Sequence, residues 1–229
     1  MRTIRWVFAA ALLALFVTPM EAQDNFEVYG TYAGSYGPYK ARVLDPSGFP
    51  NPGGVPGFPN IDVYCVDYQH RIGLPERWTV RYTQVSDGSG LATRTMWGQF
   101  GGFTPSPAAV QLRYTQAAWL ASQFWKNETS EWKGIHYAMW HVFNASTPSA
   151  ESGNSAWWLQ QAQMASNYNT VNMDYWYVVT DVNVSSISDD GSGQEYLTYV
   201  TPEPATIFLM GTGLVAVLGM TLVTRRSLG

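Results

Sequence analysis

The sequence predicts an α+β fold, in which an antiparallel β-sheet or sandwich-like domain carries an insert of two to three helices. Apolar residues alternate with period two near residues 61–68 and 77–86 and again after residue 174, whereas between residues 106 and 166 they recur at helical spacing. Strands on both sides of a block of helices describe a sheet with a helical insert. The composition is 46% apolar, 15% aromatic and 13% charged, which excludes a disordered chain.

The first predicted elements are strands. Residues 26–36 are rich in strand formers and glycine, which is typical of an edge strand. Residues 45–60 contain five prolines and four glycines and predict a long loop. The strand at 61–68 has one face formed by Ile61, Val63 and Cys65. Turn residues at 87–90 end the next strand, 77–86. Its predicted face is formed by Trp78, Val80 and Tyr82.

The middle of the chain changes to helical periodicity. A serine followed by a proline is a typical helix start and predicts a helix over residues 106–125. A second helix is predicted over residues 130–143 and a third over residues 155–166. Strand patterns return at residues 174–184 and 195–201, which completes the predicted sheet.

The N-terminus predicts a secretory signal peptide over residues 1–22. Two arginines precede an apolar run from Val7 to Val17, and a break leads to a small residue, Ala22, at the predicted cleavage site. The predicted extracellular domain therefore begins at residue 23 and extends to residue 200.

The C-terminus, residues 201–229, predicts a membrane-spanning sorting segment. Residues 205–224 carry no charge, and about twenty helical residues span the roughly 30 Å hydrocarbon core of a bilayer. The two arginines that follow are expected on the cytoplasmic side. A Pro-Glu-Pro sequence stands just before the apolar segment. The residues of this pattern are Pro202, Glu203, Pro204, Arg225 and Arg226.

Together these features resemble the PEP-CTERM sorting signal. The resemblance implies a Gram-negative bacterial protein that is recognised by an exosortase and held transiently in the inner membrane through residues 205–224. It also implies processing near the Pro-Glu-Pro sequence and release to the cell surface or the extracellular polysaccharide matrix.

Two segments of the body resemble the thioester domains of bacterial surface adhesins, over residues 26–200. They are the Tyr-Cys-Val-Asp strand at residues 64–67 and the helix that contains His136 and Trp140. The resemblance implies a cysteine and a glutamine joined as a thioester, which an amine of a partner attacks. Here His136 stands where the family has the glutamine. An imidazole has no acyl carbon, so this alignment predicts a scaffold without a working thioester.

Cys65 and His136 are the candidate catalytic residues, and three alternatives stay open for them. Cys65 can be a small buried strand residue, and His136 a histidine at the edge of the core, stacked on Trp140 one turn later. A Cys65–His136 contact can instead lower the pKa of the thiol and create a nucleophile. Gln116, in a Thr-Gln-Ala-Ala-Trp segment, is a second candidate for a thioester with Cys65.

Other functions find less support. The net charge of −4 argues against nucleic-acid binding, and neither the histidines nor the acidic loop near residue 190 have the spacing of a metal site, so no cofactor and no metal are expected. The adjacent Trp157 and Trp158 cannot both face one core and are the best candidates for a surface that binds a ligand such as a polysaccharide.

These observations predict an exported, exosortase-processed protein of the cell surface or the biofilm matrix. The predicted role is that of a non-enzymatic structural or binding module on a degenerate thioester scaffold. Its expected partners are the exosortase and the inner membrane during sorting, and then extracellular polysaccharide or a surface protein. The alternative is a covalent adhesin or a thiol-dependent enzyme that uses Cys65.

Overall fold

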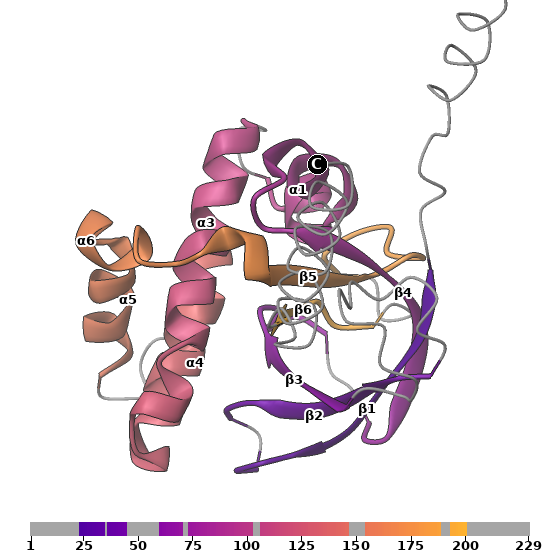
Figure 1. Ribbon diagram of the computed structural model, residues 1–229, viewed down its shortest axis with the longest axis horizontal. Helices are drawn as coiled ribbons and strands as arrows, with labels where there is room; N and C mark the ends of the chain where they lie inside the picture. The colour runs from indigo at the N-terminus through magenta and orange to yellow at the C-terminus, as the bar shows by residue number, and fades with distance from the viewer. Residues whose placement is uncertain are drawn as a thin grey trace, which may run out of the picture.

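The computed structural model describes most of the predicted extracellular domain (Figure 1). The described residues are 23–34, 36–44, 60–70, 73–102, 106–146, 154–188 and 193–200. The strands are β1 (Asp24–Thr31), β2 (Tyr39–Val43), β3 (Asn60–Cys65), β4 (Glu76–Gln84), β5 (Trp176–Asp181) and β6 (Tyr196–Tyr199). The α-helices are α1 (Gly88–Arg94), α2 (Met96–Phe100), α3 (Pro107–Ala121), α4 (Thr129–Phe143), α5 (Ser155–Gln163) and α6 (Ala165–Tyr168). Two 3₁₀ turns are η1 (Phe124–Lys126) and η2 (Met173–Tyr175).

The strands form a closed antiparallel barrel in the order β1-β2-β3-β6-β5-β4. The predicted antiparallel sheet or sandwich-like domain with a helical insert is therefore wrong, because the six strands close into a barrel. The prediction of an edge strand near residues 26–36 is wrong as well, because β1 pairs with β2 on one side and with β4 on the other. Alternation in a sequence shows which face of a strand is buried but not which strands pair, and the short strand β2 had not been recognised. Closure satisfies the hydrogen bonds that an edge would expose.

Side chains from all six strands fill the interior of the barrel, as expected for a barrel this small. The predicted faces of β3 and β4 are confirmed, since Val63, Cys65 and Val80 are buried in this interior. Ile61, Trp78 and Tyr82 are partly buried and pack against it. We call the buried set the inner cluster; it consists of Phe26, Val28, Tyr39, Ala41, Val43, Val63, Cys65, Val80, Tyr137, Trp140, Val179 and Tyr196. Two of its members, Tyr137 and Trp140, come from α4 rather than from the barrel.

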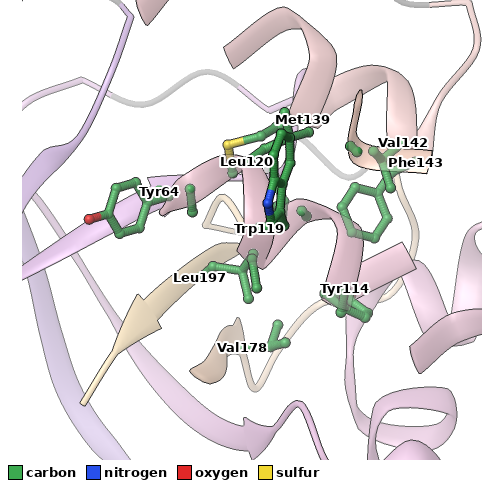
Figure 2. Close-up of a cluster of buried hydrophobic side chains, with 14 of the residues drawn as sticks. Tyr64, Tyr114, Trp119, Leu120, Met139, Val142, Phe143, Val178 and Leu197 are labelled. Atoms are coloured by element: carbon green, nitrogen blue, oxygen red, sulfur yellow. The ribbon is translucent and has the colours of Figure 1, made fainter. Parts of the chain in front are cut away.

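The helices pack against the outside of β3, β6 and β5 (Figure 1). Leu197 and Val178 leave the barrel wall on the helix side, where they meet side chains of α3 and α4 (Figure 2). We call this buried layer the outer cluster; its members include Tyr64, Tyr114, Trp119, Leu120, Met139, Val142, Phe143, Val178 and Leu197. The wall of the barrel thus separates two cores.

The predicted helices are found with shorter or shifted ends. The first ends at Ala121 and is followed by η1 instead of continuing to residue 125, and the second begins at Thr129. The residues near 87–90 do end β4, but they also start a helix that had not been predicted, because the side chain of Asp87 accepts a hydrogen bond from the Gly90 N–H and caps α1.

No helix within the described residues is long and apolar enough to cross a membrane. The predicted signal peptide, residues 1–22, and the predicted membrane segment, residues 205–224, lie outside the described residues.

Candidate functional site

Cys65 ends β3 with its side chain in the interior of the barrel and has no exposed surface. Its thiol lies 3.0 Å from the backbone carbonyl oxygen of Asp67 and 3.5 Å from the side-chain Oε1 of Gln194. Burial raises the pKa of the thiol, so it is protonated at neutral pH. A proton must therefore leave before this sulfur can act as a nucleophile.

The register of the barrel brings Gln194 to the thiol. Cys65 is paired with Tyr196 across β3 and β6, and the Val66 N–H donates to the Glu195 carbonyl at 3.0 Å, which continues the ladder beyond the strand. Residues two apart on a strand share a face, so Gln194 lies on the same inner face as Tyr196 and is a diagonal neighbour of Cys65. The contact joins residues 129 positions apart in the chain.

The hydrogen bonds of Gln194 fix the orientation of its carboxamide. Its Nε2 donates to the carbonyl oxygens of His70 and, at 3.4 Å, of Asp67. Carbonyl oxygens only accept, so these two partners identify the NH₂ end of the amide. The Oε1 end faces the thiol and accepts a hydrogen bond from the Tyr196 hydroxyl at 2.8 Å. Burial raises the pKa of Tyr196, which keeps this hydroxyl protonated as a donor.

Asp67 and His70 form a buried pair beside this amide. The Asp67 Oδ2 contacts the His70 Nδ1, and the side chains are 0% and 2% exposed. The Oδ1 of Asp67 accepts from the Gln69 N–H at 2.8 Å and thereby fixes the short loop between the two residues. No pattern in the sequence had singled out His70.

A cavity of about 820 Å³ opens onto these groups. It lies between the β1–β2 hairpin, the loop that follows β3, and α4. Its lining residues are Thr31, Gly34, Tyr36, Tyr39, Asp67, Tyr68, Gln69, His70, Leu74, Tyr137, Trp140 and Gln194. The amide of Gln194 is therefore placed between a buried thiol and a space large enough for a ligand.

The ring nitrogens of His136 contact backbone groups and not the thiol of Cys65. Its Nδ1 accepts from the Gly37 N–H at 3.0 Å, and its Nε2 donates to the backbone carbonyl of Cys65 at 3.0 Å. Burial lowers the pKa of His136 to about 3, so the ring is neutral. Its ring lies 4.3 Å from that of Trp140, as predicted for a core histidine. His136 therefore joins α4 to the hairpin and to β3, and both of its ring nitrogens contact backbone groups rather than the thiol.

The two adjacent tryptophans on α5 have different environments. Trp157 is 52% exposed, whereas Trp158 is 5% exposed and donates from its indole N–H to Glu131 at 3.0 Å. The surface position predicted for both holds for Trp157 alone. Ligand binding by this pair stays a prediction.

In the described part of the chain, no group of three or more His, Cys, Asp or Glu side chains is arranged to hold a metal ion. The acidic loop near residue 190 lies largely outside the described residues, as do the sorting residues Pro202, Glu203, Pro204, Arg225 and Arg226.

The described domain is a barrel with a buried thiol–carboxamide pair, and the residues that follow it supply the class of the protein. Residues 200–226 match the PEP-CTERM protein-sorting motif. The chain is thus an exported surface protein that an exosortase processes. No match to this chain was found among curated proteins or among solved structures.

Proposed function

We propose that Cys65 and Gln194 form an internal thioester, with which this exported protein attaches covalently to an amine of a partner at the cell surface or in the extracellular matrix. The observation that carries the proposal is the 3.5 Å contact between the thiol of Cys65 and the Gln194 Oε1 inside the barrel. This contact places the sulfur beside the carbonyl group that it would attack. The acyl carbon is one bond from this oxygen.

The bond-forming step needs no external reagent. The thiol sulfur adds to the Gln194 carbonyl carbon, a C–S bond replaces the C–N bond, and the thiol proton leaves with the amide nitrogen as ammonia. The Tyr196 hydroxyl, which donates to the carbonyl oxygen, stabilises the negative charge that develops there. The two backbone carbonyls that accept from the NH₂ end fix the orientation of the leaving group.

The second step forms the crosslink. An amine enters through the cavity and attacks the same carbon, so an amide bond to Gln194 replaces the thioester and Cys65 recovers its proton. Each molecule reacts once, so the protein acts as a single-use adhesin and not as a turnover enzyme. A surface protein of the biofilm matrix, with a polysaccharide-associated or protein partner, fits this chemistry.

This proposal replaces the degenerate scaffold expected from the sequence. That expectation rested on placing the acyl group at residue 136. The supporting geometry is at residue 194, just before the neighbouring strand β6, and the alternative partner Gln116 lies on α3, outside the cavity lining.

Mass spectrometry of the full chain tests the proposal. We expect wild-type protein to be lighter than its sequence mass by one ammonia, and digestion to yield one linked peptide pair containing Cys65 and Gln194. Cys65→Ala and Gln194→Glu should restore the full mass. Gln116→Glu is the matched control and should keep the loss. Methylamine should add to residue 194 and expose one thiol to iodoacetamide.

The contrary result is equally clear. Wild-type protein of full mass, with a thiol that iodoacetamide labels only after unfolding, would identify Cys65 as an inert core residue and overturn the proposal.

A further inference from the structure

Three exposed aromatic side chains lie together near the C-terminal end of the described domain. Trp125 from η1 is 52% exposed, and Tyr32, which follows β1, is 45% exposed with its ring 5.0 Å from that of Trp125. Tyr199, the last residue of β6, is 43% exposed and lines a cavity of about 350 Å³ together with Trp125. We call these three side chains the aromatic face. Among the described aromatic residues, only Trp157 on α5 is as exposed as these three.

Two of the three side chains have their polar atoms bonded to the protein. The indole N–H of Trp125 donates at 3.1 Å to the hydroxyl of Tyr64, which points away from the outer cluster (Figure 2). The Tyr32 hydroxyl donates to the Asp62 Oδ1 at 2.8 Å. These exposed rings therefore present apolar surface to the solvent. Apolar side chains that gather on the surface of a protein mark a site of interaction with a partner or a membrane.

The chain leaves the domain beside the aromatic face. The Val200 N–H donates to the backbone carbonyl of Tyr175 at 2.8 Å, which holds the backbone in place up to residue 200. The uncharged segment predicted to span the membrane begins only five residues later, at residue 205. An extended chain advances at most about 3.6 Å per residue, so the end of the described domain lies within about 18 Å of that segment. The surface around Tyr199 is therefore the part of the domain nearest the bilayer.

Two lysines accompany the aromatic face. Lys126 lines the same cavity as Trp125 and Tyr199, and the Lys40 ammonium group lies 4.6 Å from the centre of the Tyr32 ring. No carboxylate is among the described residues that line this cavity. Tryptophan and tyrosine are enriched at membrane–water interfaces, and lysines near the surface are attracted to anionic lipids. The chemistry of this face thus matches that of a bilayer surface.

We propose that the aromatic face is a membrane-docking surface, which rests among anionic phospholipid headgroups while the predicted segment at residues 205–224 holds the chain in the bilayer. Trp125 and Tyr199 enter the interfacial layer, and Lys126 pairs with lipid phosphates. Docking gives the domain one orientation on the membrane during sorting. Processing by the exosortase removes the anchor, so the contact lasts until release. This role does not depend on the thioester.

Quenching of tryptophan fluorescence by brominated lipids tests the proposal. The full-length protein is reconstituted into vesicles of phosphatidylethanolamine and phosphatidylglycerol whose acyl chains carry bromine close to the headgroups. Because bromine quenches only nearby indoles, Trp125→Phe should lose much of the quenching that wild-type protein shows. Trp157→Phe is the matched control and should keep that quenching, since Trp157 is also 52% exposed but lies on α5.

A negative charge on the face tests docking with Trp125 still present. Tyr199→Glu should weaken the quenching because anionic headgroups repel the new carboxylate, whereas Leu112→Glu, at an exposed position on α3, should not. Equal quenching in Trp125→Phe and wild type, or equal losses in Trp125→Phe and Trp157→Phe, would overturn the proposal. Trp125 emission that brominated lipid leaves unchanged and a purified acidic polysaccharide shifts would also overturn it, because the face would then bind a glycan.

Discussion

Gln194 and Glu195 are consecutive residues that face opposite sides of the barrel wall. Gln194 faces the inside, where its amide lies between a thiol and a cavity. Glu195 faces the outer cluster, where it accepts hydrogen bonds from the Tyr114 hydroxyl, from Thr180 at 2.7 Å, and from the Met96 N–H at 2.6 Å. Both sites are buried and hydrogen-bonded, and the inner one lines the 820 Å³ cavity. The difference separates the site of the proposed chemistry from a site that stabilises the fold.

Removal of the Glu195 carboxylate should cause the largest loss of stability among the variants that compare the two sites. Glu195→Ala leaves three buried donors without their acceptor and should lower the free energy of unfolding by about 3–5 kcal/mol. Gln194→Ala, one residue earlier, should lower it by about 1–2 kcal/mol because water in the cavity can replace the lost partners. Urea unfolding of both variants measures the difference. Equal losses would show that the two sides of the wall are not distinct.

A smaller loss of stability is expected at Gly37, whose N–H donates to His136 on the inner side of the barrel wall. Gly37 has φ of 113°, and a Cβ there would lie 2.5 Å from Cε3 of Trp132. Gly37→Ala should therefore lower the free energy of unfolding by about 2–4 kcal/mol and disturb the hydrogen bond to His136. Gly34 also has a positive φ, of 64°, but open space around its Cβ position, so Gly34→Ala is the control for backbone strain alone. Thermal unfolding at fixed pH compares the two, and equal losses would exclude the contact with Trp132 as a cause.

The pH dependence of stability should show the smallest effect, because the buried groups on the two sides of the barrel wall change stability with pH in opposite directions. Burial raises the pKa of Glu195 from 4.5 to about 7, so the folded protein holds an extra proton in that range and stability falls as pH rises. Burial lowers the pKa of His136 from 6.5 to about 3, so the unfolded chain holds the extra proton there and stability rises with pH. Between pH 4.5 and 6.5 the two contributions offset each other.

Single substitutions should reveal each contribution. Glu195→Gln should leave stability rising with pH through this range by about 1 kcal/mol per pH unit, and His136→Asn should leave it falling by a similar amount. Urea unfolding at several pH values measures the slopes. Slopes of the same sign in both variants would contradict the assigned burial of the two groups.

The sequence predicted the structural features that depend on residues near one another in the chain. The alternation around Cys65 placed it correctly on an inward face, and the helical spacing of His136 and Trp140 correctly predicted their contact. Closure of the barrel and the proximity of Gln194 depend instead on which strands pair, and the pairing of β3 with β6 joins distant parts of the chain. Gln194 stands just before a strand, and nothing in its local pattern distinguishes it from the other glutamines. The periodicity of the sequence therefore could not predict the thiol–carboxamide site.

The position of β6 as the last strand of the described residues has a mechanical consequence for an adhesin of the proposed kind. An amide to a partner would be attached at Gln194, and the sorting motif begins at residue 200, at the end of the same strand. Tension between the partner and the C-terminal attachment would pass through the few covalently bonded residues from 194 to 200. The rest of the barrel would lie outside the line of force. Its unfolding would therefore neither lengthen the connection between the partner and the C-terminal attachment nor break it.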